Sequence, residues 1–377
     1  MKIIPYGRQY IDTKDISAVS KTLKNDKITS GNEVQKFEDK INNFLKCKFS
    51  ITCNSGTSAI FLAMQAINIK KNDVIVMPVI NFIASHNIAK LFGAKIFLAD
   101  VNAQTGQMTP EDFINCCKKF KLKKVKALIV MYNGGYPENA DKFIELKKKY
   151  GFFIIEDACH ALGASYINKK KNIMVGSCRH SDLCTFSFHP LKSITTGEGG
   201  IVTTNNRYLY DKVKKLSSLG IKKKKNHWEY DVLFTGLNFR LNDFQCALGI
   251  SQLKKLKKFL SYRKKIFSEY IKSLKDLKEI QLPSFNSKYK SSNHLFIIQL
   301  KNFSLNQKNT FIKYMLKKKI ILQYHYIPIY KFKIFKGKYS SKSSKIYFNT
   351  SVSLPIYFGL SKQQQQYIVK SIKNYFH

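Results

Sequence analysis

The chain has 377 residues, of which 44% are hydrophobic, enough for one large domain with a buried core and a smaller second one. Its longest apolar stretches, such as residues 125–131, fall far short of the roughly 20 residues that span a bilayer. The N-terminus has a charge but lacks the apolar core of a signal peptide. We therefore expect a cytoplasmic protein with no membrane partner.

The net charge of +41 is extreme, and such a field attracts nucleic acid, anionic membranes or anionic substrates without choosing among them. The lysines occur in short runs along the whole chain, for example at residues 169–171, 222–225 and 317–319. Runs of like charge are usually solvated faces. We therefore expect no nucleic-acid partner, and keep a non-catalytic, basic nucleic-acid-binding or regulatory protein as an alternative.

The eight cysteines form no C-x-x-C pair and have no companion histidines at zinc-site spacing. A thiol without such partners is usually a small buried hydrophobe in a reducing compartment. The sequence therefore predicts neither a metal site nor a disulfide.

Strand-like and helical patterns alternate from about residue 53 to residue 205, which predicts an α/β domain with a mostly parallel sheet. The predicted strands cover residues 74–78, 96–99, 127–131, 152–156, 184–188 and 201–203. A long amphipathic helix is predicted over residues 242–275, with shorter strands and helices beyond it. We place a domain boundary inside this helix, so that residues 1–250 form a large α/β domain and residues 251–377 a small α+β domain. Residues 282–292 and 337–345 are expected to be loops, and residues 363–366 to extend a polar helix face.

One lysine stands in a Gly-rich segment that follows a predicted strand, Phe186-Ser-Phe-His-Pro-Leu-Lys192-Ser-Ile-Thr-Thr-Gly-Glu-Gly-Gly200. Lysine forms imines with carbonyl compounds, and partial burial lowers its pKa so that the neutral amine is populated. On its own this pattern also fits one more solvated lysine among many.

A carboxylate ends the apolar strand before it, in Ile154-Ile-Glu-Asp157-Ala-Cys-His160. Ligands in open α/β sheets bind beyond the carboxyl ends of the strands, so Asp157 would project into that crevice while Glu156 faces the other side. A carboxylate there can keep the pyridine nitrogen of pyridoxal phosphate protonated. The alternative reading of Asp157 is a helix N-cap.

A turn of small residues opens into an apolar helix at Cys53-Asn-Ser-Gly-Thr57-Ser58. Backbone N–H groups at a helix start, with the hydroxyls of Thr57 and Ser58, suit a phosphate. Ser187 would add a further hydroxyl. A capped helix without any ligand is equally consistent with this turn.

Together these segments resemble the DegT family of sugar aminotransferases, which have the fold type I architecture of pyridoxal-phosphate enzymes. Five ordered blocks carry the resemblance over nearly the whole chain: Asn54-Ser-Gly-Thr-Ser-Ala, Pro78-Val-Ile-Asn-Phe82, Glu156-Asp-Ala-Cys-His-Ala-Leu-Gly, the Lys192 segment from Ser187, and Gly236-Leu-Asn-Phe-Arg-Leu-Asn-Asp-Phe-Gln-Cys-Ala-Leu-Gly. The resemblance implies a large α/β domain, a smaller α+β domain and pyridoxal 5'-phosphate as cofactor.

The resemblance also implies roles for the matching residues. Lys192 would be the Schiff-base lysine and move the proton, and Asp157 would pair with the ring nitrogen. The other implied cofactor contacts are His160 beside the ring, Phe82 stacked on it, the phosphate contacts Thr57, Ser58 and Ser187, and Asn238 from the neighbouring subunit. A homodimer with shared active sites follows from that last contact.

Three further blocks resemble the branch of this family that serves the pseudaminic acid pathway: Pro5-Tyr6, Ser291-Ser-Asn-His-Leu295 and Gln323-Tyr-His-Tyr-Ile-Pro-Ile-Tyr330. They imply amination at C4 of a UDP-linked 4-keto-6-deoxy-N-acetyl-hexosamine, with glutamate as amino donor. Implied substrate contacts are Tyr6, Asp26, Lys27, Ile28, Thr29, Gly56, Ser187, Asn238, Gln323, Tyr324, His325 and Tyr326. Another sugar or amination at C3 stays open, whereas a dehydratase of this fold would have histidine in place of Lys192.

Overall fold

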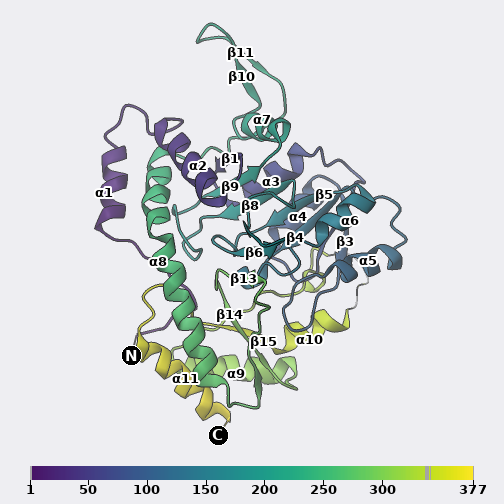
Figure 1. Cartoon of the computed structure of the whole chain (residues 1–377), viewed down its shortest axis with the longest axis vertical. Helices are drawn as coiled ribbons and strands as arrows, with labels where there is room; N and C mark the ends of the chain where they lie inside the picture. The colour runs from purple at the N-terminus through teal and green to yellow at the C-terminus, as the bar shows by residue number, and fades with distance from the viewer. Residues whose placement is uncertain (1, 336–338, 340, 377) are drawn as a thin grey trace.

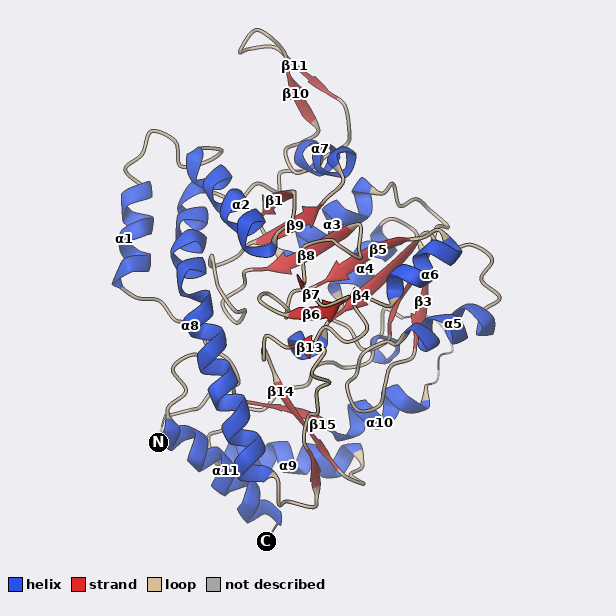
Figure 2. Ribbon diagram, in the orientation of Figure 1, coloured by secondary structure: helices blue, strands red, loops and turns tan. Residues whose placement is uncertain are grey.

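The computed structural model describes residues 2–335, 339 and 341–376. Its centre is a seven-stranded sheet, shown in Figures 1 and 2, with the strand order β1-β9-β8-β5-β4-β2-β3. Neighbours from β8 to β3 pair in parallel, and β8–β9 and β9–β1 pair antiparallel. The strands are β1 (Phe49–Cys53), β2 (Val74–Pro78), β3 (Lys95–Ala99), β4 (Ala127–Met131), β5 (Phe153–Asp157), β8 (Leu183–Ser187) and β9 (Gly200–Thr204).

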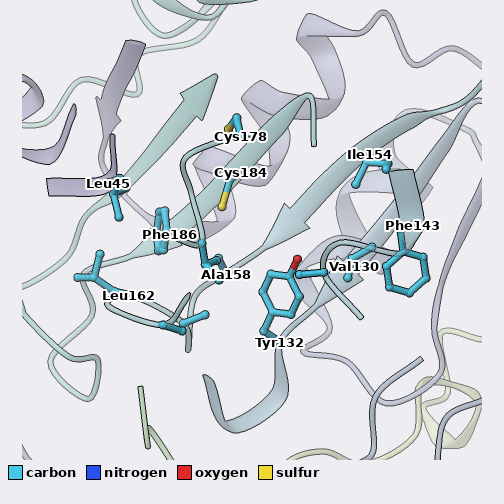
Figure 3. Close-up of a cluster of buried hydrophobic side chains, with 14 of the residues drawn as sticks. Leu45, Val130, Tyr132, Phe143, Ile154, Ala158, Leu162, Cys178, Cys184 and Phe186 are labelled. Atoms are coloured by element: carbon cyan, nitrogen blue, oxygen red, sulfur yellow. The ribbon is translucent and has the colours of Figure 1, made fainter. Parts of the chain in front are cut away.

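Helices cover both faces of this sheet, because its strands are apolar on both sides. Alternate residues of β2 divide between two buried clusters: Val76 lies in one, and Ile75 and Met77 in the other. The cluster of Val76 is the one shown in Figure 3. Its helices are α2 (Asn32–Leu45), α5 (Pro110–Lys119) and α6 (Phe143–Tyr150), and those of the other cluster are α3 (Gly56–Ala66), α4 (Ala84–Leu91) and α7 (Arg207–Leu216).

All six predicted strands are confirmed, each to within one residue at either end. The seventh strand, β1, was not predicted. It pairs antiparallel with β9, so the sheet is mixed at this edge. Two smaller elements were also missed: the sheet of β6 (Ser165–Asn168), β7 (Lys171–Met174) and β13 (Tyr289–Lys290), and the protruding hairpin of β10 (Ile221–Lys223) and β11 (Tyr230–Val232) at the top of Figure 1.

The predicted long helix is α8 (Asp243–Leu274), which runs from the large sheet to a second, three-stranded sheet (Figure 1). That sheet has the order β12-β14-β15. A third buried cluster, with Tyr270 and Phe296 in it, lies around these strands and includes Ile4 from the N-terminus. The elements here are β12 (Ile280–Gln281), β14 (Phe296–Leu300), β15 (Ser351–Leu354), α9 (Leu305–Lys317), α10 (Lys342–Thr350) and α11 (Lys362–Phe376).

Two local expectations need correction. The predicted loop at 282–292 contains β13, and that at 337–345 ends inside α10, while residues 337, 338 and 340 lie outside the described part of the chain. The glutamine tract lies in α11 as predicted, and one of its side chains, Gln365, is buried and donates to the Ile266 carbonyl at 2.8 Å. The division of domains at residue 250, within α8, stays a prediction.

Among the helices that the structure describes, none is both long and apolar enough to cross a bilayer. Helix α1 (Thr13–Thr22) lies beside α8.

Candidate active site

The carboxyl ends of β4, β5 and β8 meet at one edge of the large sheet because these strands run parallel. A cavity of about 540 Å³ lies at this edge. Its walls come from the ends of β5 and β8, the start of α3, the N-terminal segment and the segment before α10. The cavity therefore lies between the two main sheets of the molecule.

Lys192 lines the cavity and lies on a loop whose two ends are joined by backbone hydrogen bonds. The Phe188 N–H donates to the Gly199 carbonyl at 2.8 Å, and the Thr196 N–H donates to the Phe188 carbonyl at 3.0 Å. Burial lowers the pKa of Lys192, while the neighbouring Cys159 and Asp157 act in the opposite direction. A lysine held this way is suited to form an imine, as the sequence predicts.

Asp157 also lines the cavity, at the end of β5, with an exposed fraction of 3%. One of its oxygens accepts from the Cys159 N–H at 3.2 Å. Burial raises the pKa of Asp157, and Lys192 partly offsets that rise. Glu156 points to the other face, where it accepts from the Tyr132 hydroxyl at 2.6 Å, so the predicted alternation of the two carboxylates is confirmed.

The start of α3 forms a cradle beside Ser187. Ser55 caps the helix by accepting from the Ser58 N–H at 3.0 Å. A side chain at Gly56 would bring a Cβ to within 2.7 Å of the Ser187 Cβ, so this close approach requires glycine. The free N–H groups of this first turn, with Ser55, Thr57 and Ser187 in the cavity wall, can bind a phosphate.

Three buried histidines, His160, His294 and His325, also line the cavity. The rings of His160 and His294 stack at 4.3 Å. Desolvation by burial lowers the pKa of all three imidazoles, that of His325 to about 3, so they are neutral at neutral pH. His294 was not predicted as a site residue, although it stands in the quoted block of residues 291–295.

The predicted substrate block joins the same cavity, since Gln323, Tyr324, His325 and Tyr326 all line it. The ring of Tyr6 lies 5.6 Å from that of His325, and the ring of Phe82 lies 5.7 Å from that of Tyr326. Residues more than 130 positions away from Lys192 thus meet it in space. The spacing of these residues along the sequence does not by itself predict that they lie in one cavity.

Six predicted contacts do not line this cavity in the described chain. Ser58 is buried, and its hydroxyl donates to the Asn54 side chain at 2.5 Å. The Ile28 carbonyl accepts from the Asp243 N–H at 2.9 Å at the start of α8, and Asn238 is exposed near the protruding hairpin. The six are Asp26, Lys27, Ile28, Thr29, Ser58 and Asn238.

Several wall residues were missed by sequence reasoning. Asn81 and Glu198 are examples, and both stand inside quoted blocks, so nearness to a motif was the one available signal. The missed polar or thiol side chains are Ser55, Asn81, Cys159, His189, Glu198 and His294. Within the described residues, no group of three or more His, Cys, Asp or Glu side chains is arranged to hold a metal ion.

Comparison with known proteins agrees with this geometry. The DegT/DnrJ/EryC1/StrS aminotransferase family matches residues 9–373. The chain belongs to this family. It is therefore a pyridoxal-phosphate-dependent sugar aminotransferase of fold type I, and not the non-catalytic nucleic-acid-binding protein kept as an alternative.

Individual relatives are similar over the full length. The chain is 36% identical to a UDP-4-amino-4,6-dideoxy-N-acetyl-beta-L-altrosamine transaminase of Campylobacter jejuni, over 97% of this chain and 96% of the relative. It is 29% identical to a GDP-perosamine synthase of Escherichia coli O157:H7, over 100% and 99% of the two chains. The solved structure of Helicobacter pylori PseC, an aminotransferase involved in the biosynthesis of pseudoaminic acid, has a TM-score of 0.92 at 30% identity, covering 100% of this chain and 99% of its own.

The cavity residues fit the family's cofactor. A buried carboxylate, a lysine of lowered pKa and a helix start with a required glycine surround one space. Lys192 would hold the aldehyde carbon, Asp157 the ring nitrogen, and the α3 cradle with Ser187 the phosphate.

Proposed function

We propose that this aminotransferase puts an amino group onto C4 of a UDP-linked 4-keto-6-deoxy-N-acetyl-hexosamine, with glutamate as donor. The product would be UDP-4-amino-4,6-dideoxy-N-acetyl-β-L-altrosamine, a precursor of pseudaminic acid. One observation carries the proposal: Tyr6 and residues 323–326, the blocks that indicate substrate, line the same cavity as Lys192 and Asp157. The full-length similarity to the altrosamine transaminase of Campylobacter jejuni supports the choice of sugar.

When bound, pyridoxal phosphate supplies imine chemistry and an electron sink. The protein's own residues do the remaining work. The neutral amine of Lys192, favoured by its burial, takes a proton from the α-carbon of the donor and returns one at C4 of the sugar. Asp157 keeps the ring nitrogen protonated, and neutral imidazoles and hydroxyls in the cavity wall offer hydrogen bonds to sugar oxygens.

A homodimer completes the proposal. Large apolar side chains on and after the protruding hairpin are exposed in the single chain, with exposed fractions of 67% for Trp228 and 57% for Val232. Such a patch marks an interface. Asn238 stands directly beyond this segment, so the hairpin of one subunit packed against its partner would bring Asn238 toward the partner's cavity. Residues 26–29 also lie outside the cavity of their own subunit, and we propose that they too reach the cavity of the partner subunit.

The test is a reaction of the purified protein with bound pyridoxal phosphate, glutamate and the UDP-linked 4-keto-6-deoxy-N-acetyl sugar. Formation of the 4-amino sugar is expected, identified by NMR, together with 2-oxoglutarate. Lys192→Ala protein is the control for non-enzymatic amination. Turnover of a UDP-linked 3-keto sugar in place of the 4-keto sugar would overturn the proposed regiochemistry, and turnover of a GDP-linked keto-sugar instead would favour an activity like that of the perosamine synthase relative.

A further inference from the structure

Lys308 is a fully buried lysine outside the cavity, with an exposed fraction of 0%, on helix α9. Its side-chain nitrogen lies over two neighbouring aromatic rings, 4.3 Å from the ring centroid of Tyr324 and 4.4 Å from that of Phe348, and the two centroids are 5.6 Å apart. Burial lowers the pKa of Lys308 to about 7, so the protonated form is still populated at neutral pH, and a cation over aromatic faces is attracted by the ring quadrupole. Lys308 therefore contacts both rings of this pair.

The same side-chain nitrogen caps the C-terminus of helix α10. It donates to the carbonyl oxygens of Phe348 and Ser351, the latter at 3.4 Å, in the last turn of this helix and just beyond it. Carbonyls at a helix C-terminus lack partners within the helix, and the helix dipole favours a cation there. Lys308 thus links α9, the end of α10 and the start of β15.

The aromatic ring of Tyr324 and strand β15, both contacted by Lys308, also form or contact the cavity wall. Tyr324 is itself a wall residue, and its hydroxyl donates to the Asn309 side chain, next to Lys308. Strand β15 carries Ser353, whose N–H donates to the Gln323 carbonyl at 2.9 Å and whose hydroxyl lies 2.8 Å from Nδ1 of His325. Residues 323–325 are therefore held by α9 through Tyr324 and by β15 through Ser353, and Lys308 contacts both Tyr324 and the start of β15.

We propose that Lys308 is a positioning residue that sets the conformation of the sugar-nucleotide wall, residues 323–326, without touching substrate. The inference rests on the proposed function for the identity of the substrate. The part of the proposal that concerns the conformational order of residues 323–326 does not depend on the substrate, because it can be measured in the protein without substrate.

Three variants separate the effects. Lys308→Met keeps an unbranched chain but removes the charge, and Lys308→Arg keeps a charge that stacks on rings. Lys313→Met, on an exposed position of the same helix, is the matched control. Phe348→Leu, which removes one of the two rings and lies outside the cavity wall, serves if Lys308→Met does not fold.

Hydrogen–deuterium exchange of the free protein tests the wall directly. Lys308→Met is expected to raise exchange in peptides that cover residues 320–327, with no change in peptides that cover the Lys192 loop. Lys313→Met should match the unaltered protein, and Lys308→Arg should lie close to it. Unchanged exchange at 320–327 in Lys308→Met would overturn the proposal for Lys308. Failure of the unaltered enzyme to turn over a UDP-sugar would instead count against the proposed function alone.

The two half-reactions give the second readout. We expect Lys308→Met to leave the glutamate half-reaction within about twofold and to lower kcat/KM for the keto-sugar about tenfold or more, because small misplacement of binding groups is costly. Recovery in Lys308→Arg supports positioning by charge. Equal losses in both half-reactions, together with a lowered Tm, would mean a general structural role and would also overturn the proposal.

Discussion

The hydroxyl of Tyr326 lies 2.9 Å from Nε2 of His160, and this pair joins the two sides of the cavity. His160 follows β5, whereas Tyr326 belongs to the segment beside the small sheet. The Gly134 N–H donates to Nδ1 of the same imidazole at 3.4 Å. Because a neutral imidazole has one N–H, Nε2 then donates to Tyr326, and the tyrosine proton is free to point into the cavity.

Tyr326→Phe should therefore leave the His160 N–H without its acceptor. Loss of a buried hydrogen bond costs about 1–2 kcal/mol of the free energy of unfolding, measurable by urea denaturation. Sugar binding should weaken as well, since the free tyrosine proton is lost. Tyr330→Phe, outside the cavity wall, is the control. A Tyr326→Phe protein as stable as the unaltered one would mean that water replaces the hydroxyl.

Lys192→Ala is expected to abolish transamination, because among the described residues Lys192 is the one lysine that lines the cavity, where it would hold the aldehyde and move the proton. Borohydride reduction of the unaltered enzyme with pyridoxal phosphate should attach the cofactor to the peptide that contains Lys192, as detected by mass spectrometry. Exposed Lys171→Ala should behave as the unaltered protein. Attachment to a different lysine would contradict the assignment.

Asp157→Asn should lower turnover by about a hundredfold or more, because an amide cannot keep the ring nitrogen protonated. The matched control is Glu156→Gln on the opposite face of β5, which bonds Tyr132 in the core. That variant is expected to change stability more than turnover. Similar kinetic losses in both variants would indicate a packing effect instead of a role for the Asp157 charge.

Shared active sites predict complementation between two inactive proteins. A Lys192→Ala subunit still offers Asn238 to its partner, and an Asn238→Ala subunit still has Lys192. Refolding the two together should restore about a quarter of the unaltered activity if subunits pair randomly in a twofold dimer. Activity no higher than that of either protein alone would contradict a contribution of Asn238 across the interface.

The strands of the large sheet could be predicted because each is a short apolar run bounded by turn residues, as in 127–131. Strand β1 was missed because Phe49–Cys53 mixes polar Ser50 and Thr52 with apolar residues. The buried Thr52 donates to Glu38 of α2, a contact between elements that the local sequence pattern does not show. The hairpin β10–β11 was missed because its lysine runs are typical of a solvated loop.

The candidate site divides in the same way. Residues in contiguous motifs, such as Lys192 and Asp157, could be identified from local chemistry. The meeting of Tyr6 with His325 depends on the path of the N-terminal segment, where Ile4 pairs with Ile320. Lys308 could not be identified from the sequence, because what distinguishes it from the many other lysines is its burial. Burial of a lysine depends on the partners that the fold brings to it.

Glu38 predicts a pH dependence of stability. This buried carboxyl on α2 accepts from the Thr52 N–H at 2.8 Å and from the Thr52 hydroxyl at 3.0 Å. Desolvation raises the pKa of Glu38 to about 7, above its ordinary value of 4.5. Between these two pH values the folded protein binds more protons than the unfolded chain, so the contribution of Glu38 is full below pH 4.5 and is lost as pH rises through 7.

Glu38→Gln should remove this loss, because the glutamine carbonyl accepts both Thr52 bonds without a charge. We expect the variant to be more stable than the unaltered protein at pH 8 by up to about 3 kcal/mol, and nearly equal to it at pH 4.5. Thermal denaturation at several pH values measures the difference. Glu145→Gln, whose side chain is 70% exposed, is the control and should leave the pH profile unchanged. A Glu38→Gln protein less stable at pH 8 would mean that the charged carboxylate stabilises β1 more than its burial costs.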